Sequence, residues 1–297
     1  MGTRNEERLG VQNPNAGDAT APVAAEQTPQ RTGGLDFNFA MPTEFVELPS
    51  RGKFYPQNHP LGDQESVEIR HMTTKEEDIL NSETLIKQGK VFDRLISSVL
   101  VDKKIRPETL LIADKNALIL ALRIHNYGAG YNPSVTCPKC SASSEQNFDL
   151  RDCKADHNGL DSLDEDMPLE VEATSRGTFL IKNLPISNWT FEVKTLTGVE
   201  EKRYTDEIER KKKAKLSEDI LSTQISTFTV SIDEVTDIPT ILKAVAALPA
   251  KDSRLLRNMY ERIVPNLDMK QQFTCHECDH SERINLPFTA DFFWSNS

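Results

Sequence analysis

Two CxxC pairs constrain this chain more than any other feature of its sequence. The first pair is Cys137 and Cys140, and the second is Cys275 and Cys278. Four cysteine thiolates in two such turns are a ligand set typical of a structural zinc ion. Because the pairs begin 138 residues apart, one ion bound by all four would join two distant parts of the chain.

The local sequence around the two pairs is also similar. The segments read Val135-Thr-Cys-x-x-Cys-Ser-x-Ser143 and Phe273-Thr-Cys-x-x-Cys-Asp-x-Ser281. An extended segment before each pair and polar residues after it predict a zinc-ribbon-like knuckle at the turn of a β-hairpin. A redox CxxC belongs at the start of a helix in a βαβ unit, and that context is missing. The alternatives that stay open are an iron–sulfur cluster or a redox pair, a site without metal, and a site shared by two molecules of a dimer.

The likeness extends upstream of the cysteines. An offset of 138 takes Asp114 to Asp252, and an offset of 124 takes Val67–Thr73 to Phe191–Thr197. These ordered matches predict an internal duplication, with one unit at about 45–150 and its copy at about 170–290. Two domain-sized copies differ from a solenoid, whose period is about 20–50 residues.

Alternation and helical periodicity predict an α+β fold in each unit. Residues 45–48 and 67–70 alternate as strands do, and Thr73 with Glu76 forms a capping-box pattern that recurs at Thr197 and Glu200. Asp114 and Asp252 are each expected to cap a helix. Apolar residues at helical spacing are expected in the core; in the second unit they include Ile220, Leu221, Ile225, Phe228, Leu242, Val245 and Leu248.

The expected domain organisation has four parts. Residues 1–42 form a polar arm that is expected to be disordered, with Leu35–Phe39 as its one apolar segment. Residues 43–150 form the first α+β unit with its knuckle. Residues 151–168 form an acidic linker, and residues 169–297 form the second α+β unit with its knuckle.

Composition narrows the class of function. The formal net charge of −11 argues against a general binder of nucleic-acid backbones, and no apolar window is long enough to predict a membrane span. The basic run 210–213, together with the cysteines, leaves a nucleic-acid-binding zinc-ribbon regulator as the alternative function. A solvated helix face is the simpler interpretation, because acidic residues dilute the run and no aromatic residues interleave with it.

Other candidate groups carry weaker signals. His276 and His280 flank the second knuckle and are alternative metal ligands, and Cys153 is a fifth cysteine without a CxxC partner. Cysteines of this kind fit a reducing compartment better than a disulfide framework. No P-loop, GxSxG, HExxH or dinucleotide pattern occurs, so we expect no enzyme activity.

Several strings resemble one known family. They are Glu47-Leu-Pro-Ser-Arg-Gly-Lys-Phe-Tyr-Pro56, Met72-Thr-Thr-Lys-Glu-Glu-Asp-Ile-Leu80, Tyr127-Gly-Ala-Gly-Tyr131, Leu196-Thr-Gly-Val-Glu200 and Phe292-Phe-Trp294. Over about 43–294 the chain resembles the T4-like bacteriophage baseplate hub protein family.

The resemblance implies a structural or assembly role in a contractile phage tail. It implies other hub and tail proteins as partners, and a place in the host cytoplasm during assembly or in the finished tail baseplate. Neither the oligomeric state nor the partner-binding face follows from the sequence.

Overall fold

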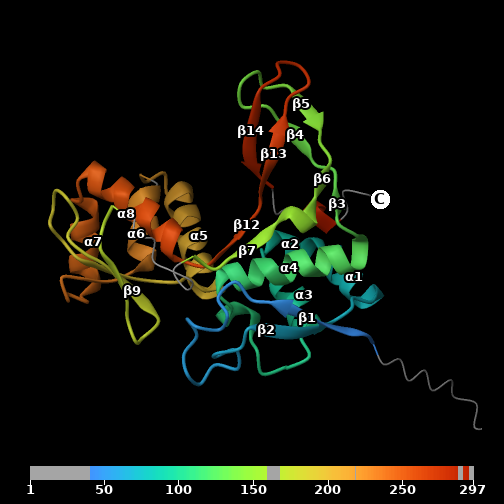
Figure 1. Ribbon diagram of the computed structural model, residues 1–297, viewed down its shortest axis with the longest axis horizontal. Helices are drawn as coiled ribbons and strands as arrows, with labels where there is room; N and C mark the ends of the chain where they lie inside the picture. Colours follow the sequence, from blue (N-terminus) through green and yellow to red (C-terminus); the bar gives the residue numbers. More distant parts are fainter. Residues whose placement is uncertain (1–40, 159–167, 218, 287–289, 294–297) are drawn as a thin grey trace, which may run out of the picture. The chain divides into compact units, whose positions relative to one another are not determined.

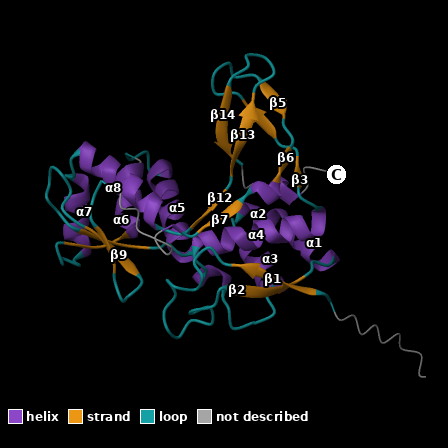
Figure 2. Ribbon diagram, viewed as in Figure 1, coloured by secondary structure: helices purple, strands orange, loops and turns teal. Residues whose placement is uncertain are grey.

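The computed structural model describes residues 41–158, 168–217, 219–286 and 290–293. The expected N-terminal arm, including Leu35–Phe39, lies outside these residues except at positions 41 and 42. Residues 159–167 of the expected linker also lie outside them. Figure 2 shows helices and small sheets intermixed along the chain, which confirms the expected mixture of helix and strand.

The elements of the first part of the chain lie between residues 43 and 156 (Figure 1). Elements labelled η are short 3-10 helices. In chain order the elements are β1 (Thr43–Glu47), β2 (Ser66–Arg70), α1 (Thr74–Leu80), α2 (Glu83–Lys87), α3 (Val91–Val99), η1 (Pro107–Thr109), α4 (Ile112–Tyr127), β3 (Gly130–Tyr131), β4 (Ser134–Thr136), β5 (Ser143–Glu145), β6 (Phe148–Asp149), η2 (Leu150–Asp152) and β7 (Lys154–Asp156).

The elements of the second part follow residue 168. They are β8 (Val171–Ala173), β9 (Thr178–Ile181), β10 (Phe191–Lys194), α5 (Gly198–Lys213), α6 (Ile220–Phe228), β11 (Thr229–Ile232), α7 (Ile238–Ala246), α8 (Ala250–Ile263), β12 (Asn266–Asp268), β13 (Lys270–Thr274), β14 (Ser281–Asn285) and η4 (Ala290–Phe293).

All described strand pairs are antiparallel. The sheet of the second part has the order β11-β10-β9-β8, and the remaining strands form two-stranded pairs. In the pair β1–β2, Val46 lies opposite Val67, so both apolar side chains face the core. β7 pairs with β12, which places Asp156 opposite Asn266. Residues 151–158 of the expected linker therefore contain the end of η2 and all of β7. The domain boundaries themselves stay a prediction.

The first hydrophobic core combines both ends of the described chain. It holds buried side chains from β1, β2, α3 and α4, and also residues that follow α8. The latter are Leu267, Met269, Phe273, Cys275, Leu286, Phe292 and Phe293. The C-terminal stretch therefore packs on the elements of the first part.

In the described part of the chain, the fully buried side chains of the second core come from residues between 179 and 263, and Phe54 of the first part packs against them. Phe179, Phe191, Phe228, Leu256 and Met259 are all fully or almost fully buried in it. Val245 and Ile225 are buried as the helical periodicity predicts.

Three of the expected core residues are exposed instead. Ile220 and Leu221 at the start of α6 and Leu242 on α7 lie on the outer surface of their helices. Periodicity identified the apolar stripe of each helix, but the second core covers only part of it.

None of the helices in the described residues is both long enough and apolar enough to cross a membrane.

The two predicted capping boxes are formed. The backbone N–H of Thr73 donates to Glu76 at 2.9 Å, and that of Thr197 donates to Glu200 at 3.0 Å. In this way α1 and α5 each begin with their free backbone donors partly satisfied.

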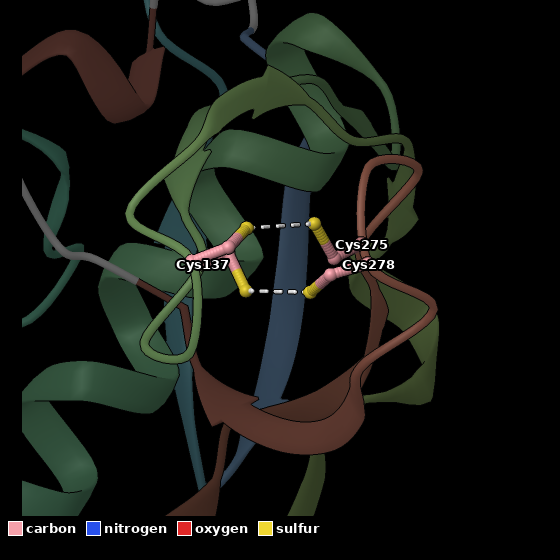
Figure 3. Close-up of side chains that lie close together, drawn as sticks. Cys137, Cys275 and Cys278 are labelled. Atoms are coloured by element: carbon pink, nitrogen blue, oxygen red, sulfur yellow. Dashed lines mark hydrogen bonds between the residues drawn. The ribbon is translucent and has the colours of Figure 1, made fainter.

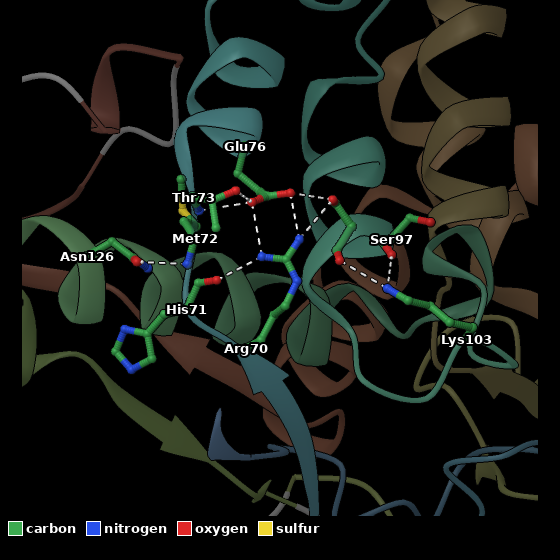
Figure 4. A network of polar contacts seen from close by, with 9 residues as sticks. Arg70, His71, Met72, Thr73, Glu76, Ser97, Lys103 and Asn126 are labelled. Carbon is green, nitrogen blue, oxygen red and sulfur yellow. Dashed lines mark hydrogen bonds and ion pairs between the residues drawn. The ribbon is translucent and has the colours of Figure 1, made fainter. Parts of the chain in front are cut away.

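Glu76 also lies at the centre of a buried polar network (Figure 4). Arg70 from β2 donates to both of its carboxylate oxygens, at 3.0 and 2.7 Å, and the Ser98 hydroxyl of α3 donates as well. Burial alone raises the pKa of Glu76, but the hydrogen bonds from Arg70, Ser98 and Thr73 outweigh it and hold the pKa well below 4.5. The network therefore joins β2, α1 and α3.

Asp114 and Asp252 do not cap helices, which corrects the sequence-based expectation. The N-caps of α4 and α8 are Leu111 and Pro249, and both aspartates are buried inside the first turn.

Each of the two aspartates accepts hydrogen bonds from a loop that is distant in sequence. Asp114 accepts hydrogen bonds from the backbone N–H of Ser50 at 3.0 Å, from the Ser50 hydroxyl at 2.6 Å and from the Tyr55 hydroxyl at 2.8 Å. Asp252 accepts from the backbone N–H groups of Ile186 and Ser187. Burial raises the pKa of Asp114, while the hydrogen bonds from Ser50 and Tyr55 act to lower it.

We expect Asp114→Asn to lower the free energy of unfolding by about 3 kcal/mol, because an amide turns a donor toward buried donors of Ser50 and Tyr55. Urea titration followed by circular dichroism measures this change. The exposed Asp63→Asn is the control and should stay within about 0.5 kcal/mol of the parent chain. Equal values for both variants would show that the buried contacts of Asp114 contribute nothing.

The depressed pKa values of the capping glutamates predict acid sensitivity. Burial is outweighed at Glu200 by hydrogen bonds from Lys194 and Thr197, so that its pKa is about 2. Between pH 4.5 and 2 the unfolded chain binds protons that the folded chain does not, so stability falls as the pH falls. Glu76→Gln plus Glu200→Gln should flatten this dependence in urea titrations at pH 7, 4.5 and 3. Glu83→Gln, at an exposed site, is the control, and parallel curves for all three chains would contradict the prediction.

Candidate metal centre

The two CxxC pairs lie at the tips of two β-hairpins with the same register. In the hairpin β4–β5 Thr136 lies opposite Ser143, and in β13–β14 Thr274 lies opposite Ser281. These positions differ by 138 residues, the offset seen in the sequence. The predicted placement of each CxxC at a hairpin turn is therefore what the structure has.

Both turns close with the same backbone hydrogen bonds. The N–H of Cys137 donates to the carbonyl of Ala142 at 2.8 Å, and the N–H of Cys275 donates to the carbonyl of His280 at 2.8 Å. Ser141 and Asp279 each adopt the left-handed region, with φ of 60° and 52°. Each turn folds its two cysteines to one side of the hairpin.

The four sulfur atoms converge in one cluster (Figure 3). All four Sγ atoms lie within 4.8 Å of one another. Across the two hairpins, Cys137 Sγ lies 3.8 Å from Cys278 Sγ, and Cys140 Sγ lies 3.6 Å from Cys275 Sγ. A tetrahedral zinc ion with Zn–S bonds of about 2.3 Å separates its sulfurs by about 3.8 Å. The cluster could therefore hold a metal ion with little rearrangement.

The close approach of the four sulfurs shifts the pKa values of the cysteine thiols. Burial acts to raise the pKa of Cys137, but the backbone N–H groups of Cys140 and Lys139 and the neighbouring sulfurs lower it to about 6. At Cys278 the backbone N–H of His280 acts to lower the pKa, but burial and the other three sulfurs raise it to about 12. One thiol thus ionises readily while another holds its proton, as expected for four sulfurs that repel one another as thiolates.

The cluster is closed toward the protein and open at one edge. Cys137 and Cys275 are buried in the first core, Cys278 is half-buried and Cys140 is exposed. A set of four thiolates fills a tetrahedral coordination shell and leaves no position for a substrate. The arrangement fits a structural metal better than a catalytic one.

Contacts outside the cysteines hold the second hairpin in place. Phe273 on β13 is completely buried in the first core, and the Gln271 side chain donates to the carbonyl of Asp149 at 2.7 Å. Arg123 on α4 is also buried and donates to the carbonyls of Phe292 and Gly130 at 2.9 and 2.8 Å. From its sequence Arg123 is expected to be an ion-pair or cap partner of a nearby helix. Its contact with Phe292 could not be foreseen, because the acceptor is a backbone carbonyl that any residue supplies.

The remaining candidate ligands are not part of the cluster. In the described part of the chain, the group that could bind a metal consists of the four cysteines alone. His280 Nε2 lies 3.3 Å from a carboxylate oxygen of Glu282. Cys153 is buried elsewhere and accepts from the Gln271 side chain at 3.5 Å. Its role as a separate thiol stays a prediction.

The basic run on α5 is largely compensated by carboxylates. Arg210 pairs with Glu207 at 2.7 Å, and Lys213 pairs with Glu209 at 2.9 Å. Lys211 lies 3.8 Å from Glu207. These pairs favour the interpretation as a solvated helix face, so the basic run supports no second candidate function.

The fold and the cluster define the chain as a mixed helix-and-strand protein with four cysteines that lie close enough together to bind a metal ion. A family model described as T4 bacteriophage base plate protein matches residues 41–294. The chain belongs to this family. The comparisons found no curated protein and no solved structure that matches the chain.

We expect Phe273→Ala to lower the free energy of unfolding by about 3–5 kcal/mol, because it leaves a cavity where the second hairpin enters the first core. Chemical denaturation at constant metal content measures the loss. Phe45→Ala is the matched control, since Phe45 is 71% exposed and its removal should cost less than about 0.5 kcal/mol. Similar losses for both variants would mean that Phe273 does not anchor the hairpin.

Proposed function

We propose that this protein is a structural component of a contractile phage tail and takes part in assembly of the baseplate hub through contacts with other tail proteins. Membership of the base plate protein family over residues 41–294 supports the structural role. The assignment to the hub rests on the resemblance of about residues 43–294 to the hub protein family. Membership of the family supports a location in the tail of the virion, and action in the host cytoplasm during assembly is part of the proposal.

The observation that carries the proposal is the convergence of Cys137, Cys140, Cys275 and Cys278. A baseplate component works by holding a shape against its neighbours, and a metal ion bound by both hairpins would fix the C-terminal stretch to the first core. Zn²⁺ is the ion that best suits four thiolates with tetrahedral spacing. When bound it supplies a rigid cross-link, and the chain supplies all four ligands.

An internal duplication is part of the same proposal. Equivalent positions carry the capping glutamates Glu76 and Glu200 and the buried aspartates Asp114 and Asp252. The two knuckles share one register and one turn geometry. A duplicated unit that contributes half of a metal site from each copy explains why each CxxC pair alone is incomplete.

Metal analysis tests directly whether one ion joins the two cysteine hairpins. We expect one zinc ion per chain by native mass spectrometry and elemental analysis of the same sample. Cys137→Ser plus Cys275→Ser should remove the ion and lower the thermal midpoint by about 10 °C or more, because binding energy in such sites is coupled to folding.

Cys153→Ser is the matched control for metal content and should keep the ion, because Cys153 lies outside the cluster. Binding of other tail proteins should weaken with the double variant and stay unchanged with the control. The proposed metal cross-link would be wrong if the wild-type protein contained no metal. It would also be wrong if the double variant kept its stability and its partner binding.

A further inference from the structure

The four cysteines are placed to form covalent bonds across the two hairpins as well as to bind a metal ion. Cys140 Sγ lies 3.6 Å from Cys275 Sγ, and Cys137 Sγ lies 3.8 Å from Cys278 Sγ. Both contacts join one hairpin to the other, and Figure 3 shows them side by side. A disulfide has an S–S length of about 2.05 Å, so each pair of sulfurs needs to approach by less than about 2 Å. Side-chain rotation supplies a movement of this size without a shift of either hairpin.

The packing of the hairpins keeps the two sets of sulfurs opposite each other. Val135 on β4 and Phe273 on β13 are both buried in the first core. The Gln271 side chain on β13 donates to the carbonyl of Asp149 at 2.7 Å. These contacts do not involve the sulfurs, so they persist when the bonding between the cysteines changes.

The two cross-hairpin pairs differ in their access to solvent. Cys140 is exposed and Cys278 is half-buried, whereas their neighbours Cys275 and Cys137 are buried. An oxidant in solvent therefore reaches one sulfur of each pair first, and the buried sulfur beside it can then displace the oxidised group. Cys140 is the more exposed of the two, so we expect the pair that contains it to react first.

We propose that the cysteine cluster is a redox-sensitive cross-link between the two hairpins. A peroxide converts the four cysteines into two disulfides, Cys140–Cys275 and Cys137–Cys278, and the metal ion is released. This inference rests on the metal cross-link proposed above and adds the bonds that replace the ion. The hairpins then stay joined under oxidising as well as reducing conditions.

The reaction balances with hydrogen peroxide as the oxidant. The first thiolate of a pair attacks the O–O bond of the peroxide, becomes a sulfenic acid and releases hydroxide. The second thiolate attacks the oxidised sulfur, the S–S bond forms and a second hydroxide leaves. Each disulfide therefore takes two electrons from sulfur and reduces one peroxide. For the whole cluster, four thiolates with Zn²⁺ and two peroxides give two disulfides, four hydroxides and free Zn²⁺, whose charge is unchanged.

A cross-link of this kind suits a tail protein that meets two environments. Thiols stay reduced in the cytoplasm, where the protein is proposed to act during assembly, whereas surroundings outside the cell favour disulfides. A cross-link made by the metal alone would be lost when its thiolates are oxidised. Disulfides across the hairpins preserve the connection between the same two turns.

Disulfide mapping of the full-length, zinc-loaded protein tests the inference. Lys139 and Glu277 each lie between the two cysteines of a pair, so trypsin with a glutamate-specific protease separates all four cysteines. Two equivalents of hydrogen peroxide should release the zinc ion to a chromogenic chelator. After free thiols are blocked, mass spectrometry without reductant should find the Cys140–Cys275 link first and the Cys137–Cys278 link second. Cys153 is the internal control, because it lies outside the cluster and should remain a thiol.

Thermal unfolding gives a second readout. The oxidised, zinc-free protein should keep its midpoint within about 3 °C of the zinc-loaded protein, because two disulfides join the same hairpins. Reduction in the presence of a chelator should then lower the midpoint by about 10 °C or more. Equal midpoints for the oxidised protein and the reduced, metal-free protein would contradict the inference.

The outcomes separate this inference from the metal cross-link. If the protein contains zinc but peroxide links the two cysteines within each CxxC pair, or links two chains, the redox inference alone is wrong. Sulfinic acids without disulfides would have the same meaning. If the protein contains no zinc but both cross-hairpin disulfides form, the metal cross-link is wrong and the redox pairing stands.

Discussion

Four cysteine sulfurs within 4.8 Å of one another are the constraint on which the rest of this structure depends. As thiolates they repel, so the cluster requires protons or a cation. Each hairpin supplies two sulfurs through the same turn, and neither hairpin can complete the set. Residues 137–140 and 275–278 must therefore meet, and the stretch between them must leave the first core and return to it. The shared first core and the pair β7–β12 satisfy this requirement without the metal.

Features encoded within a few residues could be predicted from the sequence. The capping boxes at Thr73 and Thr197 and the hairpin turns at the cysteines depend on neighbours three to six positions away, and they were predicted correctly. The aspartates at 114 and 252 were wrongly predicted as caps. An Asp near a helix start has the same local pattern whether it caps that helix or accepts from a loop about 65 residues away.

Long-range packing could not be predicted in the same way. Helical periodicity shows that Leu242 belongs to an apolar stripe, but it does not show whether the second core or a partner covers that stripe. Likewise, the apolar character of Phe273 predicts burial, yet nothing near it indicates the first core. The meeting of the four cysteines could be predicted because their spacing is specific, and their role as metal ligands stays a proposal. The contacts of Arg123 and Gln271 could not be predicted in this way, because they act through backbone carbonyls.

The residues of the two cores are completed at different points during translation. Every residue of the second core has been added once the ribosome passes Ile263. The first core still lacks Leu267, Phe273 and Phe293 at that point. Domains usually fold in the order in which they are synthesised. The first core begins earlier in the chain but is completed later, so the nascent chain exposes an unfinished apolar surface until Phe293 has emerged.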